Sequence, residues 1–225
     1  MGKNFGTEKA PDLLIQNGKE VLIHVSHIDE TMKVLSETTG DFFVGGDHSI
    51  SYGSFKGFAR EFKNPGIIVF DAHPDCYPDD FVNHENWVYH LINEKVLKKE
   101  NIILIGLRLI DQKELEFLCN NKIKYFLMGD LFKNEKNVCD TVLELVREFD
   151  ALYLSVDIDV LDPVFAPGTG YLEVGGMNLN QLIYFLNRIK TLRNLRRIDL
   201  VEINPDKDVN GVTVKLGRKI IEIFL

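Results

Sequence analysis

Three short clusters of aspartate and histidine follow apolar, strand-like runs in this sequence. Their members, in chain order, are His48, Asp71, His73, Asp75, Asp157 and Asp159. In an open parallel sheet, residues that follow the strands meet in one crevice at the carboxyl edge, where ligands bind. The six side chains, two imidazoles and four carboxylates, should therefore converge. One divalent cation rarely takes so many protein ligands at a catalytic site, whereas two cations that share carboxylates would use them all, and such a pair suits the activation of water for hydrolysis.

The second cluster, Asp71-Ala72-His73-Pro74-Asp75, places ionisable groups at alternate positions. If the strand continues through it, the three side chains share a face, because strand side chains repeat every two residues. A helix N-terminus could satisfy one buried aspartate, but three ionisable groups within five residues must be paired or metal-bound when buried. Asp157 and Asp159 repeat the pattern, and neighbouring carboxylates repel unless a cation neutralises them.

His48 alone would be weak evidence, because a single histidine is more often a core or capping residue. Its place after a strand-like run and before Ser49, which we expect to be a helix N-cap, favours a ligand role. Carboxylates and imidazoles without a thiolate suit a fairly hard cation such as Mn²⁺. The same set is compatible with Fe²⁺, Co²⁺, Ni²⁺ or Zn²⁺.

Two further residues could act on a substrate. His84 could pass a proton to a leaving amine, since histidine titrates near neutrality. The alternative is an ordinary histidine of a loop or helix start. Glu202 ends the last strand-like run, and its carboxylate could accept two parallel hydrogen bonds from a guanidinium. The alternative for Glu202 is an arginine partner elsewhere in the fold.

Apolar runs alternate with amphipathic stretches along the whole chain. We expect strands at 21–25, 42–44, 66–70, 102–106, 125–127, 152–156 and 198–203. Helical spacing of apolar positions predicts helices at 51–62, 87–99, 112–120, 138–149 and 179–192. Strands that are apolar on both faces belong in a parallel sheet covered by helices. The sequence therefore predicts one α/β domain over residues 1–225, with a doubly wound, mostly parallel sheet and helices on both faces.

The stretch from 161 to 178 is dense in proline and glycine, which rules out a regular element. A long loop directly after the run that carries Asp157 and Asp159 is more often the wall of a site than a spacer. We therefore expect this segment to border the metal ligands.

Composition narrows the partners and the location. A net charge of −8 argues against a nucleic-acid partner, because phosphate binding needs a clustered basic surface. No apolar run is long enough to cross a bilayer, so no membrane partner is expected. The three cysteines are far apart, which together with the polar N-terminus favours reduced thiols in a cytoplasmic protein.

The segments 45–49, 71–75 and 155–163 resemble, in the correct order, the three metal motifs of the ureohydrolase family. This family comprises arginases, agmatinases and formiminoglutamases, and the similarity runs from about Gly6 to Asn204. The resemblance implies that Asp71 and Asp157 bridge two metals. It implies one metal each for His48, His73, Asp75 and Asp159.

The same resemblance identifies His84 as a catalytic histidine, Glu202 as the guanidinium-binding glutamate and Asp159 as a support for the tetrahedral intermediate. Thr169, in the matching segment 166–170, becomes a candidate substrate contact. The family implies an arginase-like three-layer fold, two Mn²⁺ ions per chain, and a homo-oligomer, either a trimer or a hexamer. A small guanidino compound and water are the implied reactants, and urea is the implied product.

The sequence also departs from the family pattern. It is shorter than most members, and we expect the strand and loop that normally precede the segment 6–11 to be missing. Pro74 replaces a small polar residue, which removes one backbone donor. The segment 171–174 lacks a proline that is common in this loop.

Substrate choice depends on the stretch 76–83, which is short and acidic. Asp79 and Asp80 would repel a carboxylate and attract an amine, which favours agmatine, with putrescine as product, over arginine. Arginase or formiminoglutamase activity on the same scaffold is the alternative. A catalytically weak homologue that serves as an assembly or regulatory subunit is an alternative of another class. All six ligands and Glu202 are present, which argues against it, because a structural role needs none of them.

Overall fold

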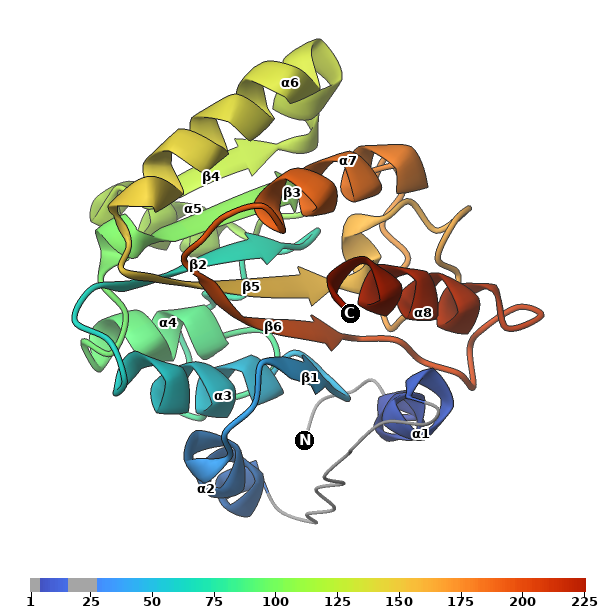
Figure 1. Ribbon diagram of the computed structural model, residues 1–225, viewed down its shortest axis with the longest axis horizontal. Coiled ribbons are helices and arrows are strands. Elements are labelled where there is room, and N and C mark those ends of the chain that lie inside the picture. Colours follow the sequence, from blue (N-terminus) through green and yellow to red (C-terminus); the bar gives the residue numbers. More distant parts are fainter. Residues whose placement is uncertain (1–4, 16–27) are drawn as a thin grey trace.

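The computed structural model describes residues 5–15 and 28–225. Within these residues, six strands form one parallel sheet in the order β1-β6-β5-β2-β3-β4, and their arrows all point the same way in Figure 1. The strands are β1 (Phe42–Val44), β2 (Pro65–Phe70), β3 (Ile102–Leu107), β4 (Lys124–Leu127), β5 (Ala151–Asp157) and β6 (Leu195–Val201).

Helices cover both faces of the sheet (Figure 1). On one face lie α1 (Ala10–Leu14), α6 (Met128–Leu145), α7 (Leu179–Ile189) and α8 (Val212–Phe224). On the other lie α3 (Ile50–Ala59), α4 (Trp87–Asn93) and α5 (Gln112–Asn121), while α2 (Ile28–Glu37) packs against α3. The molecule is thus the three-layer α/β structure that the sequence predicted.

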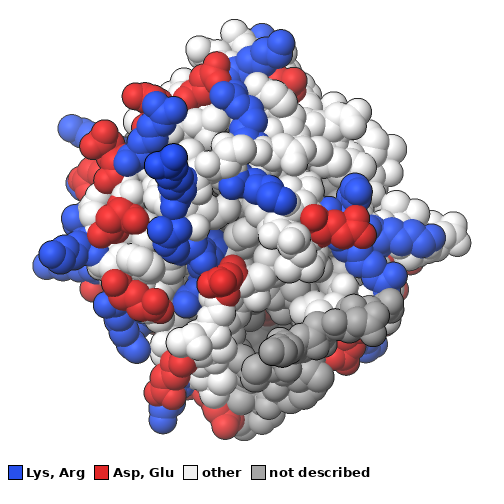
Figure 2. Space-filling model, viewed as in Figure 1, with Lys and Arg blue, Asp and Glu red and all other residues white. Residues whose placement is uncertain are grey.

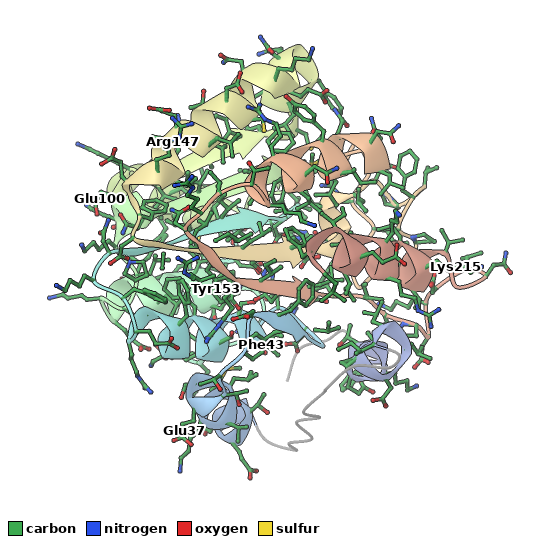
Figure 3. All side chains as sticks on the ribbon, in the orientation of Figure 1. Glu37, Phe43, Glu100, Arg147, Tyr153 and Lys215 are labelled. Carbon is green, nitrogen blue, oxygen red and sulfur yellow. The ribbon has the colours of Figure 1, made fainter. Side chains whose placement is uncertain are left out.

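The strands explain why their sequences show no polar alternation. In β2, Ile68 and Phe70 pack into the core on one face of the sheet, and Ile67 and Val69 pack into the core on the other. Successive strand residues point to opposite faces, and both faces here are covered, so every position must be apolar. Figure 3 shows side chains filling the space between the layers, with Tyr153 of β5 in the interior.

At the centre of the sheet, the order in which successive strands are added changes direction. Neighbouring strands β2 and β5 continue to opposite sides, β2 toward β3 and β5 toward β6. Ligands of doubly wound sheets bind at such a reversal, outside the carboxyl ends of the strands. Because Phe70 pairs with Val156 across these strands, Asp71 and Asp157 follow side by side at this point.

Several element boundaries differ from the sequence-based expectations. The strand expected at 66–70 ends at Phe70 as predicted, so the condition that it continues through 71–75 is not met, and Asp75 adopts a left-handed φ of 50°. The last strand ends at Val201, and Glu202 follows it with a φ of 64°. The clustering of the ligands therefore comes from turns after the strands, and the period of a strand does not produce it.

The expected helices also differ in extent. The helix expected at 87–99 ends at Asn93, because Lys95 takes a left-handed φ of 59°. The helix expected at 138–149 is the part of α6 that follows a break at Asn134, whose φ of −162° and ψ of 79° are not helical, and it gives way to a 3₁₀ turn after Leu145. Those expected at 51–62 and 179–192 end at Ala59 and Ile189. Helices α1, α2 and α8 were not expected, and the strand expected at 21–25 lies outside the described residues.

The described part of the chain has no helix that is long and apolar enough to span a membrane. On the face shown in Figure 2, lysine and arginine side chains are interspersed with aspartate and glutamate. The cysteines Cys76, Cys119 and Cys139 are free.

Candidate metal centre

The six predicted ligands lie together at the carboxyl edge of the sheet. His48 lies between β1 and α3, and Asp71 follows β2. Asp157 is the last residue of β5, and Asp159 lies in the 3₁₀ turn Ile158–Val160. Two groups have ligand atoms within 4.8 Å of one another: His48, Asp71 and Asp157 form one, and Asp71, His73 and Asp159 form the other. Asp71 belongs to both.

The buried imidazole of His48 is surrounded by carboxylates. Its Nδ1 lies 2.9 Å from Asp75 Oδ2, 3.0 Å from Asp71 Oδ2 and 3.2 Å from Asp157 Oδ2. One ring nitrogen carries at most one proton, so it cannot satisfy three carboxylates by hydrogen bonding. The other nitrogen, Nε2, lies 2.9 Å from the Ser155 hydroxyl, a contact typical of a metal-bound histidine whose second nitrogen is held in place.

The second group is more open than the first. His73 Nδ1 lies 3.1 Å from Asp159 Oδ2 and 3.4 Å from Asp71 Oδ1. The side chain of His73 is 20% exposed, whereas that of His48 is 1% exposed. The position beside His48, called the sealed position below, is therefore enclosed in the protein, and the position beside His73, called the open position, is partly exposed to solvent.

The buried carboxylates of the cluster repel one another. Burial, followed by repulsion from Asp159 and Asp71, raises the pKa of Asp157 well above its usual value. Burial and the neighbouring Asp71 raise the pKa of Asp75 as well. Among the described residues, His48 Nδ1 and Asp71 Oδ2 lie 3.0 Å apart without the geometry of a hydrogen bond, and neither buried atom makes a hydrogen bond elsewhere. Buried polar atoms are normally satisfied, so this donor set of carboxylates and imidazoles fits divalent cations.

Backbone amides hold the carboxylates in place. His73 N–H donates to Asp71 Oδ1 at 2.7 Å, and Asp159 N–H donates to Asp157 Oδ1 at 2.8 Å. The N–H of Ala72 donates to Asp159 Oδ1 at 3.1 Å. In each pair one carboxylate oxygen is fixed by the backbone, which orients the other toward the histidines.

Arg108, which was not among the predicted site residues, connects the turn that carries Asp159 to the loop that follows it. It follows β3, and its guanidinium donates to the carbonyl oxygens of Asp159, Leu161 and Glu173, at 2.5, 3.2 and 2.8 Å. These bonds tie the turn that carries Asp159 to the loop from 161 to 178. Desolvation by burial lowers the pKa of Arg108. The feature of the sequence that could have identified Arg108 is its place directly after an apolar strand, at the edge of the sheet where the ligands lie.

His84 is connected to the more open metal position through the ring of Tyr171. It is 7% exposed, and its ring stacks on Tyr171 with centroids 6.1 Å apart and planes at 20°. The Tyr171 ring also contacts His73, at 5.6 Å between centroids, and its hydroxyl donates to Glu85 at 3.2 Å. Across the described ranges, neither ring nitrogen of His84 has a hydrogen-bond partner, although Nε2 lies 3.7 Å from Glu85 Oε1.

Glu202 lies beside His48, and Thr169 lies on a loop that is bonded to the segment following Glu202. Glu202 is buried, and its Oε1 accepts the backbone N–H of His48 at 2.7 Å. Thr169 is also buried, and its hydroxyl has no hydrogen-bond partner within 5–15 and 28–225. The Asn204 N–H donates to the Gly168 carbonyl at 2.7 Å, so the loop that carries Thr169 is attached to the segment that carries Glu202.

Two other expectations concern residues outside the buried cluster. Asp79 and Asp80 are exposed on the loop after the second motif, and Asp80 N–H donates to the Asp79 carboxylate at 2.7 Å. Ser49 stands at the N-cap position of α3, but the expected capping bond is absent. Its hydroxyl donates instead to the Asp47 carboxylate, which fixes the turn that carries His48.

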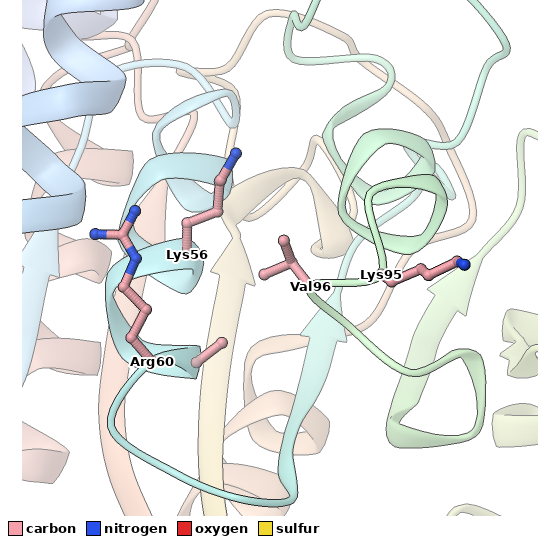
Figure 4. A pocket seen from close by; sticks show the side chains of 5 residues that line it. Lys56, Arg60, Lys95 and Val96 are labelled. Atoms are coloured by element: carbon pink, nitrogen blue, oxygen red, sulfur yellow. The ribbon is translucent and has the colours of Figure 1, made fainter.

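A surface pocket of about 260 Å³ lies far from this cluster. It is formed by the C-terminal part of α3 and the turn after α4, and its lining includes Lys56, Arg60, Lys95 and Val96 (Figure 4). These segments lie toward the amino ends of the strands, and Lys56 is paired with Glu94 at 2.7 Å. The pocket contains none of the candidate ligands.

A buried acid beside Asp75 gives a pH-dependent prediction. Burial raises the pKa of Glu114 from 4.5 to about 7, against hydrogen bonds from the backbone of Asp111 and Cys76. Between these values the unfolded chain loses the proton while the folded protein keeps it, so stability falls as pH rises from about 4.5 to about 7. Glu114→Gln should remove this loss, measured by chemical denaturation of the metal-free protein. Exposed Glu116→Gln, in the same helix, is the control, and an unchanged pH slope in Glu114→Gln would refute the assignment.

Comparisons with known proteins give the family. The family profile "Arginase" (Arginase family) matches residues 2–225. An arginase of Staphylococcus aureus strain MRSA252 is 32% identical, over 88% of this chain and 73% of the relative. An agmatinase of Proteus mirabilis is 31% identical, over 84% of this chain and 60% of the relative. The chain thus spans between three fifths and three quarters of the length of these two relatives.

Solved structures agree with the sequence relatives. An arginase of Bacillus cereus is similar with a TM-score of 0.79 and 25% identity, over 88% of this chain and 75% of that one. A formimidoylglutamase of Bacillus subtilis has a TM-score of 0.84 at 22% identity, over 96% and 79% of the two chains, and supports the fold alone. The chain is therefore a member of the arginase family of ureohydrolases.

Proposed function

We propose that this protein is a hydrolase that cleaves a guanidino carbon–nitrogen bond and releases urea, with two divalent cations, Mn²⁺ first among them, as cofactor. The observation that carries the proposal is Asp71, whose carboxylate belongs to two separate groups of ligand atoms. Arginases and an agmatinase among the relatives support the reaction class.

The ligands would divide into two sets that share bridging carboxylates. His48 and Asp75 would serve the sealed position, His73 and Asp159 the open one, and Asp71 with Asp157 would bridge both. When bound, such a pair supplies activated water at neutral pH and stabilises developing negative charge. The remaining work of orienting the substrate and moving its proton belongs to other side chains.

Glu202 is suited to orienting the guanidinium. It is buried beside His48, and hydrogen bonds between a guanidinium and a desolvated carboxylate are short and strong. His84 is suited to passing a proton to the departing amine, because its nitrogens lie buried near the open position without a described hydrogen-bond partner. The Thr169 hydroxyl is also buried without a described hydrogen-bond partner and could donate a hydrogen bond to the substrate or accept one from it.

For the substrate, we propose agmatine. Asp79 and Asp80 lie on an exposed acidic loop that follows the ligand Asp75 in the chain, and they favour an amine over a carboxylate. L-arginine is the second candidate, favoured by the name arginase on relatives such as the 32% identical staphylococcal protein.

A comparison of urea release from agmatine and L-arginine at equal concentration tests this choice. Agmatine should be the better substrate, and Asp79→Asn with Asp80→Asn should narrow the ratio of the two rates by no more than about thirtyfold, because two exposed charge pairs contribute under about 1 kcal/mol each. Asp29→Asn with Asp41→Asn removes the same charge at exposed positions elsewhere and should leave the ratio unchanged. A wild-type preference for arginine, or an unchanged ratio in the first variant, would refute the charge argument.

A further inference from the structure

The single tryptophan of the chain, Trp87, lies fully buried against the candidate metal centre. It is the first residue of α4. Its indole Nε1–H donates to Asp75 Oδ2 at 2.8 Å, and its ring lies 4.9 Å from the His48 imidazole, centroid to centroid, with the planes at 43°. One side chain therefore contacts two candidate ligands that come from different segments of the chain.

Asp75 needs such support because its backbone is in an unfavourable conformation. Its φ of 50° lies in the left-handed region, which residues other than glycine seldom occupy. Its carbonyl accepts the N–H of Val88, in the first turn of α4, at 3.0 Å. Trp87 and Val88 thus hold Asp75 by side chain and backbone. Because the indole N–H is a donor only and is buried, rotation of the Asp75 carboxylate would leave it unsatisfied.

The two ligands that Trp87 contacts, Asp75 and His48, lie 2.9 Å apart and would both serve the sealed position. The aromatic neighbour of His73, in the open group, is Tyr171. Removal of the indole N–H should therefore lower the metal affinity of the sealed position and leave that of the open position unchanged. Donors that orient metal ligands typically affect metal affinity by about ten- to a hundredfold.

We propose that Trp87 is a positioning residue for the sealed cation position, where it fixes the Asp75 carboxylate and the plane of the His48 imidazole. The proposal rests on the cation pair of the proposed function. It extends that function by assigning a support to one of the two cation positions.

The main test is a Mn²⁺ titration of the wild type and of Trp87→Phe by calorimetry. Phenylalanine keeps a ring but has no N–H. One of the two affinities should fall about ten- to a hundredfold, and the other should stay within about threefold. Tyr89→Phe, in the same helix, is the control and should leave both affinities unchanged.

A second measurement uses the wild-type indole and does not depend on how well Trp87→Phe folds. A sole tryptophan gives one indole N–H signal in a ¹⁵N-labelled sample, and diamagnetic Zn²⁺ should shift it. The shift should persist in His73→Ala and disappear in His48→Ala. The proposal is overturned if the indole signal does not shift when the metal is added. It is also overturned if Trp87→Phe leaves both metal affinities unchanged or lowers both equally. If the wild type binds fewer than two ions, the proposed function itself fails.

Discussion

Exchange of Asp71 for asparagine is expected to abolish binding of both metal ions and to lower urea release by about a thousandfold or more. Asp71 is the member common to the two ligand groups, and it lies where β2 and β5 diverge at the centre of the sheet. Asparagine keeps the size of the side chain but removes the charge that a bridging ligand supplies. Elemental analysis after dialysis against Mn²⁺, together with a urea assay, measures both effects.

The control for this experiment is a second buried carboxylate away from the ligands. Asp199 is fully buried and accepts hydrogen bonds from Ser51 and Tyr153, both at 2.6 Å. Asp199→Asn should retain two metal ions per chain. If Asp71→Asn also retains two ions, Asp71 does not bridge them.

Exchange of His84 for asparagine should leave both metal ions in place and lower turnover by about a hundredfold to ten-thousandfold, the usual range for loss of a proton-transfer group. His84 contacts Tyr171, and the ring of Tyr171 contacts the ligand His73, so it is close to the reacting region without belonging to either ligand group. His90→Asn, in the following helix, should stay within about threefold of the wild-type turnover, by the small effect expected of substitutions away from the site. Unchanged turnover in His84→Asn would remove this residue from the mechanism.

The sheet could be predicted from the sequence because a strand that is buried on both faces has an uninterrupted apolar sequence. Strands β2, β3 and β5 are buried along their whole length, and their uninterrupted apolar runs indicated a parallel sheet covered on both faces. Ligands placed at the ends of such strands converge for topological reasons. The clustering of His48, Asp71 and Asp157 could therefore be predicted without knowledge of the helices.

Other features depend on contacts that no local pattern records. Apolar spacing continues past Asn93 through Val96 and Leu97, yet the helix ends there because the chain turns at Lys95. The apolar residues beyond the turn pack as part of a loop, so spacing alone overestimates the helix. The alternation of Asp71, His73 and Asp75 likewise did not indicate the left-handed conformation of Asp75, whose carbonyl accepts a hydrogen bond from the first turn of α4.

The side chains that hold the candidate ligands in place could not be identified from the sequence either. Trp87 looked like an ordinary apolar position at the start of a helix, and Arg108 looked like a charge after a strand. Their roles follow from partners far along the chain, such as Asp159 and Glu173 for Arg108. Glu202 was identified by motif, but its bond to the His48 backbone depends on the pairing of β1 with β6.

The central claim is that two bound cations make this protein a urea-releasing hydrolase, and a metal titration of activity tests it most directly. Metal-free protein is loaded with increasing equivalents of Mn²⁺, and urea formed from agmatine and from L-arginine is measured at each step. We predict negligible urea without metal, and a rise that reaches its plateau at two equivalents per chain, as expected for the two ligand groups that share Asp71. Absence of urea from either substrate at full loading, or a plateau at one equivalent, would contradict the account.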